Sequence, residues 1–164
     1  MSLDTIVIER ANLPDADAIL KLAEANEEEH GGTLSSHLVL GALIATLGLL
    51  PSIVARKNSQ VVGFLLTWEK RGSNPPIVQA MLEAYPGEED ACLYGPVCVD
   101  AAMRGQGLAG AMFKEMRRLL PGRQGILFIK PNNEPSLRAH RKMGMQTVAE
   151  FIYEGNKYYV LAYH

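Results

Sequence analysis

The segment Arg104-Gly105-Gln106-Gly107-Leu108-Ala109-Gly110 is the most informative stretch of this chain. It follows an apolar run at 91–100, which has the composition of a β-strand, and it opens an amphipathic stretch from about 107 to 120 that is typical of a helix. A strand, a glycine-rich turn and a helix N-terminus together form an anion site, because glycine allows close backbone approach and the helix dipole adds partial positive charge. The segment therefore predicts a phosphate-bearing ligand.

The glycines at 105–110 also match the dinucleotide fingerprint G-x-G-x-x-G, which is a weak signal when it stands alone. In that fold the first glycine directly follows the strand, whereas residues 101–104 intervene here, and Lys130 stands about where an acidic residue is expected. The Gly-Lys-Ser/Thr triplet of the Walker motif does not follow the glycines. The glycine segment therefore has three possible roles: it binds a phosphate-bearing ligand other than a dinucleotide, it binds a dinucleotide, or it is a purely structural turn.

Residues 99–109 resemble the first signature of the GNAT superfamily, in which Arg or Gln is followed by two residues, Gly, one residue, and then Gly or Ala. Residues 133–145 are similar to the second signature of that family, an Asn-led helix that ends in Tyr-x-Lys-x-Gly-Phe. The residues that match are Arg104, Gly107, Ala109, Asn133, Lys142 and Gly144. Two signatures in order, about thirty residues apart, are much more specific than either alone.

The resemblance implies an α/β fold with a single domain over residues 1–164, built on a strongly twisted mixed sheet of six to seven strands with about four helices on both faces. It implies an N-acetyltransferase that moves an acetyl group from acetyl-CoA, as co-substrate, to a primary amine by direct attack. The acceptor is a small-molecule amine or a peptide amine. The alternatives are an inactive coenzyme A-binding module and a dinucleotide-binding protein.

The resemblance also assigns roles to individual residues. The loop backbone would wrap the pyrophosphate of coenzyme A, Val99 would pair with the pantetheine arm, and the backbone N–H of Val97 would hold the acetyl carbonyl, which makes Val97 a catalytic candidate. The cofactor-binding residues implied in this way are Val97, Val99, Arg104, Gly105, Gln106, Gly107, Leu108, Ala109, Asn133 and Ser136.

The chain departs from the family pattern at His140, where relatives usually place a tyrosine as general acid, and at Met145, where they usually place phenylalanine. A tyrosine is always protonated at pH 7, whereas an unperturbed histidine, with a pKa of about 6.5, is protonated only about a quarter of the time. His140 is the second catalytic candidate. It acts as a pH-dependent acid, donates a hydrogen bond to sulfur, or is only a packed histidine, and the sequence leaves these three roles open.

The general base is not evident from the sequence, because Leu93 and Gly95, which are expected to share the strand face of Val97, cannot titrate. An ordered water or a carboxylate of the acidic first half must take the amine proton. The candidates are Glu28, Glu29, Glu69, Glu88 and Glu89. A metal is not expected, since His30 and His37 are spaced across two glycines in no known ligand pattern.

The pattern of apolar residues and turn signals predicts seven strands and helices in mixed order. The second helix, over the apolar run 38–50, is expected to be capped by Thr33, Ser35 or Ser36 and to pack in the core, with a dimer face or an acceptor-site wall as its alternative role. The expected strands are 6–8, 52–56, 61–68, 91–100, 126–129, 147–153 and 158–163, and the other expected helices are 14–26, 77–85, 107–120 and 134–142.

Composition sets the remaining expectations. Residues 1–90 hold six Lys/Arg and thirteen Asp/Glu, whereas residues 91–164 hold ten and five, which suits an anionic cofactor on the second half and a cationic acceptor facing the first. The longest nearly uncharged apolar run has 13 residues, too few for a membrane span of about 20. The N-terminal residues lack a secretory pattern, so we expect a cytoplasmic protein without nucleic-acid or membrane partners. Cys92 and Cys98, about 20 Å apart along one strand, are predicted to be unpaired, buried thiols.

Overall fold

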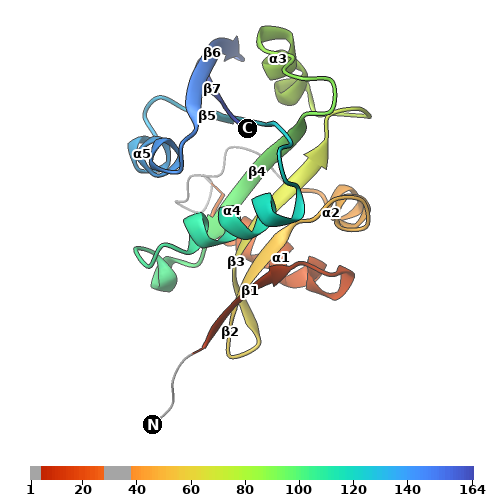
Figure 1. Ribbon diagram of the computed structural model, residues 1–164, viewed down its shortest axis with the longest axis vertical. Coiled ribbons are helices and arrows are strands. Elements are labelled where there is room, and N and C mark those ends of the chain that lie inside the picture. Colours follow the sequence, from red (N-terminus) through yellow and green to blue (C-terminus); the bar gives the residue numbers. More distant parts are fainter. Residues whose placement is uncertain (1–4, 28–37) are drawn as a thin grey trace. The chain divides into compact units, whose positions relative to one another are not determined.

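The computed structural model describes residues 5–27 and 38–164 of the 164-residue chain. It divides into two compact units, the first formed by residues 1–68 and 95–121 and the second by residues 69–94 and 122–164. Strand β4 (Cys92–Val99) runs from the second unit into the first, and each unit is described by itself below. In the described part of the chain, hydrogen bonding gives the strand order β1-β2-β3-β4-β5-β7-β6 (Figure 1).

The first unit is built on three antiparallel strands, β1 (Ile6–Arg10), β2 (Ile53–Lys57) and β3 (Gln60–Glu69). The connection between β2 and β3 is a two-residue turn at Asn58 and Ser59, both with positive φ, which suits the twist of a hairpin. The helical segments are η1 (Leu13–Asp15), α1 (Ala16–Ala25), α2 (Leu40–Leu47), η3 (Ala101–Met103) and α4 (Leu108–Leu119).

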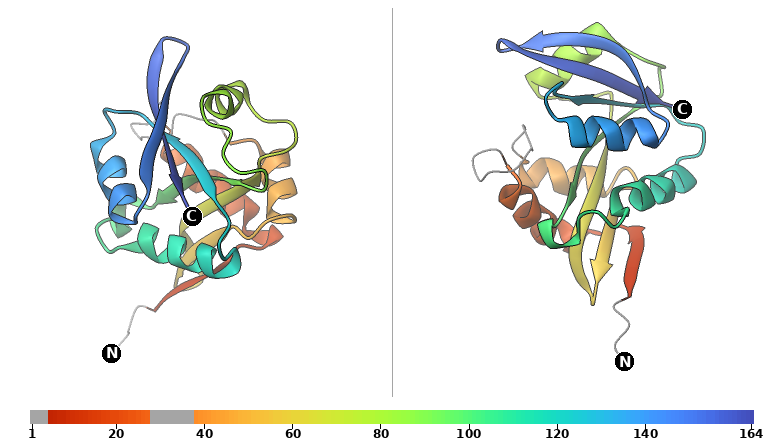
Figure 2. Two further views of the ribbon diagram at one scale, coloured as in Figure 1. Left: turned by 45° about the horizontal axis from the view of Figure 1, so that its top comes forward. Right: turned by 90° about the vertical axis from the view of Figure 1, so that its left-hand side faces the viewer.

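Helices cover both faces of the sheet in the first unit (Figure 2). On one face, Val54 and Phe64 belong to the same buried cluster as Ile19 of α1 and Leu43 of α2. On the other, a Cβ placed on Gly63 would lie 3.2 Å from the terminal methyl of Met112, so the absence of a side chain lets α4 approach β3 closely. The sheet, packed against helices on both faces, therefore supports α4 and the loop that precedes it.

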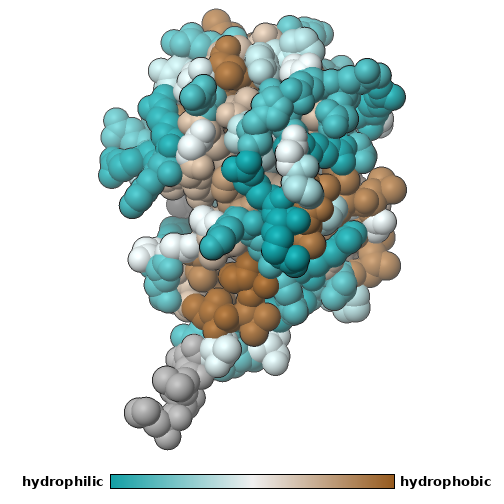
Figure 3. All heavy atoms as spheres, in the orientation of Figure 1, coloured by the Kyte–Doolittle hydropathy of each residue, from teal (hydrophilic) through white to brown (hydrophobic). Residues whose placement is uncertain are grey.

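Helix α2 buries one side and exposes the other. Leu43 and Leu47 are buried, which confirms the expected core role of this helix. Leu40 and Ile44 are 39% and 44% exposed, and Figure 3 shows apolar surface where Figure 1 places α2. The alternative roles of this helix, a dimer face or a wall of the acceptor site, stay predictions.

The second unit contains α3 (Pro76–Ala84), residues 92–94 of β4, β5 (Gly125–Ile129), α5 (Glu134–Lys142), β6 (Gln146–Tyr153) and β7 (Asn156–Tyr163). Strand β5 pairs in parallel with β4 at Cys92 and Leu93, and antiparallel with β7. Strands β6 and β7 form a hairpin across Glu154 and Gly155, both with positive φ. Helix α5 follows the carboxyl end of β5 in the chain.

The expected fold class is confirmed: a seven-strand, mostly antiparallel mixed sheet with five α-helices in the described residues. The family resemblance implies about four helices; the described part of the chain has five, including the helix expected at 77–85, which is observed at Pro76–Ala84. The expected caps of α2, Thr33, Ser35 and Ser36, lie outside the described residues. Helix α2 begins at Leu40 with Val39 as its N-cap, so the prediction of these caps is wrong. Cys92 and Cys98 are free and buried, as expected.

No helix in the described ranges has the length and apolar character needed to cross a bilayer. The cellular compartment stays a prediction.

A partly buried ion pair fixes the start of α1 against β2. The Arg56 guanidinium donates to both carboxylate oxygens of Asp15, at 2.7 and 2.8 Å, and also to Glu9, while the Asn12 N–H donates to Asp15 at 2.8 Å. Burial raises the pKa of Asp15, but the hydrogen bonds from Arg56 and Asn12 outweigh it, so the pKa is lowered from its ordinary value. The ionised carboxylate is therefore the form that stabilises the fold.

Replacing Asp15 with asparagine is expected to cost about 2 kcal/mol of unfolding free energy at pH 7, since hydrogen bonds to charged groups contribute about 1.5–3 kcal/mol. Because the pKa of Asp15 is lowered on folding, this stabilisation is present above the unfolded-state pKa and is lost as pH falls through the folded-state value. Urea unfolding at pH 7 and pH 3 measures it. The control is Glu89→Gln, which breaks the exposed pair with Arg71 and should cost little. Equal losses of unfolding free energy in the Asp15→Asn and Glu89→Gln variants would contradict the stabilising role given to the ionised Asp15.

Candidate cofactor and acyl-transfer site

The glycine loop lies between β4 and α4 in the first unit. Gly105 and Gly107 have φ values of 80° and 76°, in the left-handed region that favours glycine, and no described atom lies within 4 Å of a Cβ built on either. Gly107 is the N-cap of α4, and Leu108 begins the helix. The loop is therefore open on the side where these side chains would be.

The start of α4 presents backbone N–H groups without partners inside the helix, because the first four donors of any α-helix have none. No acidic residue occupies its first turn, and Arg117 and Arg118 lie in its last turn. The helix dipole adds partial positive charge at the N-terminus. This arrangement suits a phosphate or pyrophosphate group, and the residues present fit the anion site that the sequence predicted.

The Arg104 side chain is held by the protein itself. Its Nε donates to the carbonyl of Val99 at 3.3 Å, and one Nη donates to Oδ1 of Asn26 at 2.5 Å. Asn26 is the C-cap of α1 and is 8% exposed. Two of the predicted cofactor residues, Val99 and Arg104, are thus brought together in the first unit, and Asn26 is a partner that sequence analysis missed.

Strand β4 supplies the other predicted backbone positions. Val97 and Val99 are half-buried near its end. Gly95 has a φ of 109°, which interrupts the regular extended conformation of the strand. The Trp68 Nε1–H donates to the Gly95 carbonyl at 2.6 Å and so fixes the strand at this irregular point.

Helix α5, in the second unit, carries the remaining predicted residues. Asn133 is its N-cap, and its side chain accepts a 3.4 Å hydrogen bond from the Ser136 N–H. His140 lies one turn after Ser136 and is 3% exposed. The structure therefore brings Asn133, Ser136 and His140 together on one helix.

Hydrogen bonds determine where the proton of His140 lies. Its Nδ1 is 2.7 Å from the carbonyl oxygen of Ser136, and a carbonyl only accepts, so Nδ1 carries the hydrogen of the neutral ring. The Nε2 atom, left with a lone pair, is 3.0 Å from the Tyr94 hydroxyl, which therefore donates to it. The two rings meet edge to face, 5.4 Å between centroids.

Burial shifts both groups toward their neutral forms. Desolvation lowers the pKa of His140, and the hydrogen bond to the Ser136 carbonyl opposes this only in part. Burial also raises the pKa of Tyr94 far above its ordinary value. At neutral pH the proton between Nε2 and the hydroxyl thus belongs to the phenol. Tyr94 is a second residue that sequence analysis missed, because no local pattern connects a strand residue with a helix 46 positions later.

The carboxylates suggested as general base are engaged where the structure describes them. Glu69 pairs with Arg123 at 3.0 Å, Glu89 with Arg71 at 2.5 Å, and Glu88 with the His164 ring at 2.6 Å. Two candidates, Glu28 and Glu29, lie outside the described residues. The same holds for His30 and His37, which were not expected to bind a metal. Among the described residues, no group of three His, Cys, Asp or Glu side chains could hold a metal ion.

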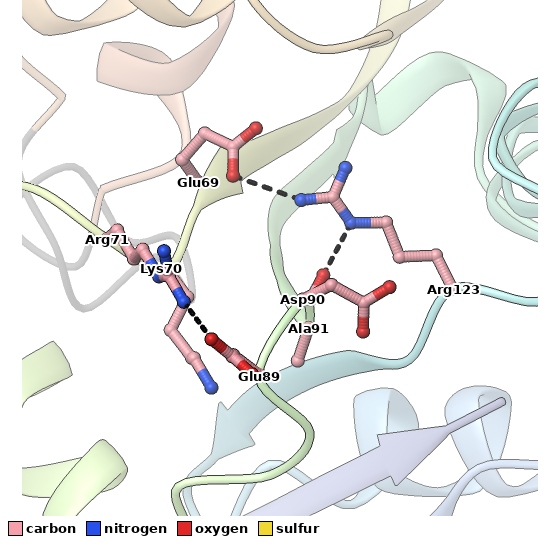
Figure 4. A pocket seen from close by; sticks show the side chains of 7 residues that line it. All are labelled: Glu69, Lys70, Arg71, Glu89, Asp90, Ala91 and Arg123. Carbon is pink, nitrogen blue, oxygen red and sulfur yellow. Dashed lines mark hydrogen bonds and ion pairs between the residues drawn. The ribbon is translucent and has the colours of Figure 1, made fainter.

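A charged pocket of about 510 Å³ lies elsewhere in the second unit (Figure 4). Ion pairs cross its walls between Arg123 and Glu69 and between Arg71 and Glu89, and the Arg123 Nε donates to the Asp90 carbonyl. It contains none of the predicted cofactor residues. We regard it as a surface ion-pair network of the second unit.

The match to a family sequence model makes the chain an acyl-CoA N-acyltransferase with acetyl-CoA as co-substrate. The chain belongs to the acetyltransferase (GNAT) family, whose sequence model matches residues 17–145. A comparison with curated protein sequences gave no match.

Solved structures share this fold over nearly the whole chain. The protein yncA from Salmonella typhimurium, solved with its cofactor acetyl-CoA, is 17% identical, with a TM-score of 0.69 over 98% of this chain and 94% of that one. The ribosomal-protein-alanine N-acetyltransferase from Brucella melitensis is 20% identical, with a TM-score of 0.69 over 96% and 98%. NAA60 from Arabidopsis thaliana, in complex with a bisubstrate analogue, is 16% identical, with a TM-score of 0.68 over 97% of both chains. At such identities the likeness concerns the fold.

Proposed function

We propose that this enzyme transfers an acetyl group from acetyl-CoA to a primary amine by direct attack, without a covalent enzyme intermediate. The observation that carries the proposal is the open, left-handed loop at Gly105 and Gly107 at the N-terminus of α4. Acetyl-CoA supplies the acetyl group as an activated thioester. The residues of the chain bind the cofactor, orient the acetyl carbonyl, and assist the removal of a proton from the amine and the delivery of a proton to the leaving sulfur.

The binding roles follow the family resemblance. Loop N–H groups from Gly105 to Ala109 hold the pyrophosphate, aided by the α4 dipole. The Val99 backbone pairs with the pantetheine arm, and the Val97 N–H donates to the acetyl oxygen, where negative charge develops. Asn133 and Ser136 contribute from α5, where they also cap the helix.

The proton roles fall to two parts of the molecule. His140, at the position of the usual tyrosine, supplies the proton to the leaving sulfur when its ring is protonated, since the neutral ring carries its N–H on Nδ1, bonded to the Ser136 carbonyl. An ordered water or a carboxylate takes the amine proton; of the carboxylates suggested, Glu69 and Glu89 are paired with Arg123 and Arg71, and Glu88 lies 2.6 Å from the His164 ring. The acceptor is proposed to be a small-molecule or peptide amine, and a homodimer through the exposed side of α2 is part of the same proposal.

Acetyl-CoA is expected to raise the thermal stability of the protein, by about 2.7 kcal/mol at a hundredfold excess over its dissociation constant. NAD should give no shift, because the loop lacks the features of the dinucleotide fold noted above. Differential scanning fluorimetry with coenzyme A, acetyl-CoA and NAD measures both. Release of free thiol from acetyl-CoA, with a panel of small amines and of peptides with free N-termini, then identifies the acceptor class. A melting shift with NAD and none with coenzyme A would overturn the cofactor assignment.

A further inference from the structure

We infer that Arg104 is a positioning residue that ties the glycine loop to the C-terminal end of α1 through Asn26, rather than a side-chain ligand of the pyrophosphate. The inference rests on the proposed function, because it assigns the loop to coenzyme A. It goes beyond that proposal, which gives the Arg104 guanidinium no role of its own. The partners of the guanidinium carry the argument.

Asn26 is oriented by a second hydrogen bond. Its Nδ2 donates to the carbonyl of Leu22 at 2.8 Å, which leaves Oδ1 as the acceptor that faces Arg104. The backbone N–H of Asn26 also bonds to α1, at the Ala23 carbonyl. The amide therefore cannot turn without losing a bond to the helix, and it is a fixed anchor for the guanidinium.

Arg104 reaches this anchor from a defined point of the loop. Its Nε bond to the Val99 carbonyl folds the side chain back over the turn that η3 makes between β4 and the glycines. Asp100 caps that turn through Ala102, and the Asp100 N–H bonds to Val62 of β3. The loop is thus attached to β3 on one side and to α1 on the other, next to the glycine with a φ of 80°.

Preorganisation is the physical consequence. Two glycines make the loop open but also costly to order, because glycine loses more conformational freedom than any other residue. A guanidinium held at two points limits that freedom before the cofactor arrives, so less entropy is lost on binding. Arginine suits the role, because its planar fork can reach a carbonyl and an amide oxygen at once, whereas lysine provides a single point charge.

A double-mutant cycle with Asn26→Ala and Arg104→Lys separates the two roles of Arg104, with coenzyme A binding measured by calorimetry. We expect each single change to weaken binding by about tenfold, and the double variant to be no weaker than either single variant, because one interaction is lost in all three. The control is Asn74→Ala, which removes an amide with the same bond to the carbonyl four residues earlier and should leave binding unchanged. Unchanged binding in Asn26→Ala with weaker binding in Arg104→Lys would overturn the inference, as would additive losses.

Hydrogen exchange of the backbone amides from Gly105 to Leu108 tests the inference without any ligand. Faster exchange is expected in both single variants and not in Asn74→Ala. Arg104→Lys leaves the α1 cap intact, so it remains informative if Asn26→Ala is too unstable to study. Exchange at the wild-type rate in Arg104→Lys would show that the loop does not depend on the contact. Failure of the wild-type protein to bind coenzyme A would instead contradict the proposed function.

Discussion

Replacing Gly107 with aspartate is expected to abolish coenzyme A binding while the protein remains folded. The new carboxylate would lie at the N-cap of α4, where the pyrophosphate is proposed to bind. Two unit charges about 4 Å apart repel by about 4 kcal/mol in the effective dielectric near a protein surface, which is about a thousandfold in affinity. The thermal shift of about 2.7 kcal/mol at a hundredfold excess should therefore vanish.

The backbone permits this substitution. No described atom lies within 4 Å of a Cβ at residue 107, and aspartate is among the residues that tolerate a positive φ best. Gly107→Ala introduces the backbone strain without the charge and should retain most of the binding. Gly122→Asp is the matched charge control, since Gly122 has a φ of 72° and similar open space but follows the C-terminal end of α4. Coenzyme A binding that persists unchanged in Gly107→Asp would mean that the loop is only a structural turn.

Local signals in the sequence were sufficient for most helix and strand boundaries. Helix α5 spans Glu134–Lys142 as expected, because an asparagine at its N-cap and Gly144, with a φ of 98°, mark its two ends. The loop conformation followed from its glycines in the same way. The start of α2 was not predicted, because Thr33, Ser35 and Ser36 suggested an earlier start, whereas its N-cap is Val39, which makes no side-chain cap, and an apolar run alone does not fix where a helix begins.

The long-range hydrogen bonds of the candidate site had no counterpart in the sequence pattern. Asn26 and Arg104 are 78 residues apart, and Tyr94 and His140 are 46 residues apart. Neither pair has a spacing that periodicity can detect, because the contacts depend on how elements pack after they form. The carboxylates proposed as bases show the same limit: their ion pairs with Arg71, Arg123 and His164 appear only in the folded chain.

The sequence also could not show the state of His140. An unperturbed pKa of about 6.5 suggested a ring that is charged for part of the time at pH 7. In the fold, burial lowers the pKa, and the bonds to the Ser136 carbonyl and the Tyr94 hydroxyl are those of a neutral ring. The pH range in which His140 can supply a proton from Nε2 therefore moves below 6.5.

Mutation of His140 is expected to have the second large effect. If the imidazolium supplies the proton, kcat is full below the pKa of His140 and declines as pH rises through it. Because that pKa is lowered, the decline should lie on the acidic side of pH 6.5. His140→Phe should reduce kcat by about 10²-fold in this acidic range, the lower end for general-acid catalysis. His140→Tyr should keep activity and remove the decline, since a phenol stays protonated to about pH 10.

The measurement is the pH dependence of kcat at saturating acetyl-CoA with a weakly basic amine, which is already unprotonated across the acidic range. Unfolding must be measured in parallel, because His140→Phe removes the bonds to Tyr94 and Ser136, each contributing about 1 kcal/mol. His164→Phe is the matched control, since this histidine is exposed and its ring lies 2.6 Å from the exposed Glu88. Wild-type kcat and an unaltered pH profile in a folded His140→Phe protein would show that His140 is only a packed residue, and that the thiolate leaves unassisted or receives its proton from another donor, for which the Tyr94 hydroxyl, 3.0 Å from Nε2 of His140, is the group to test.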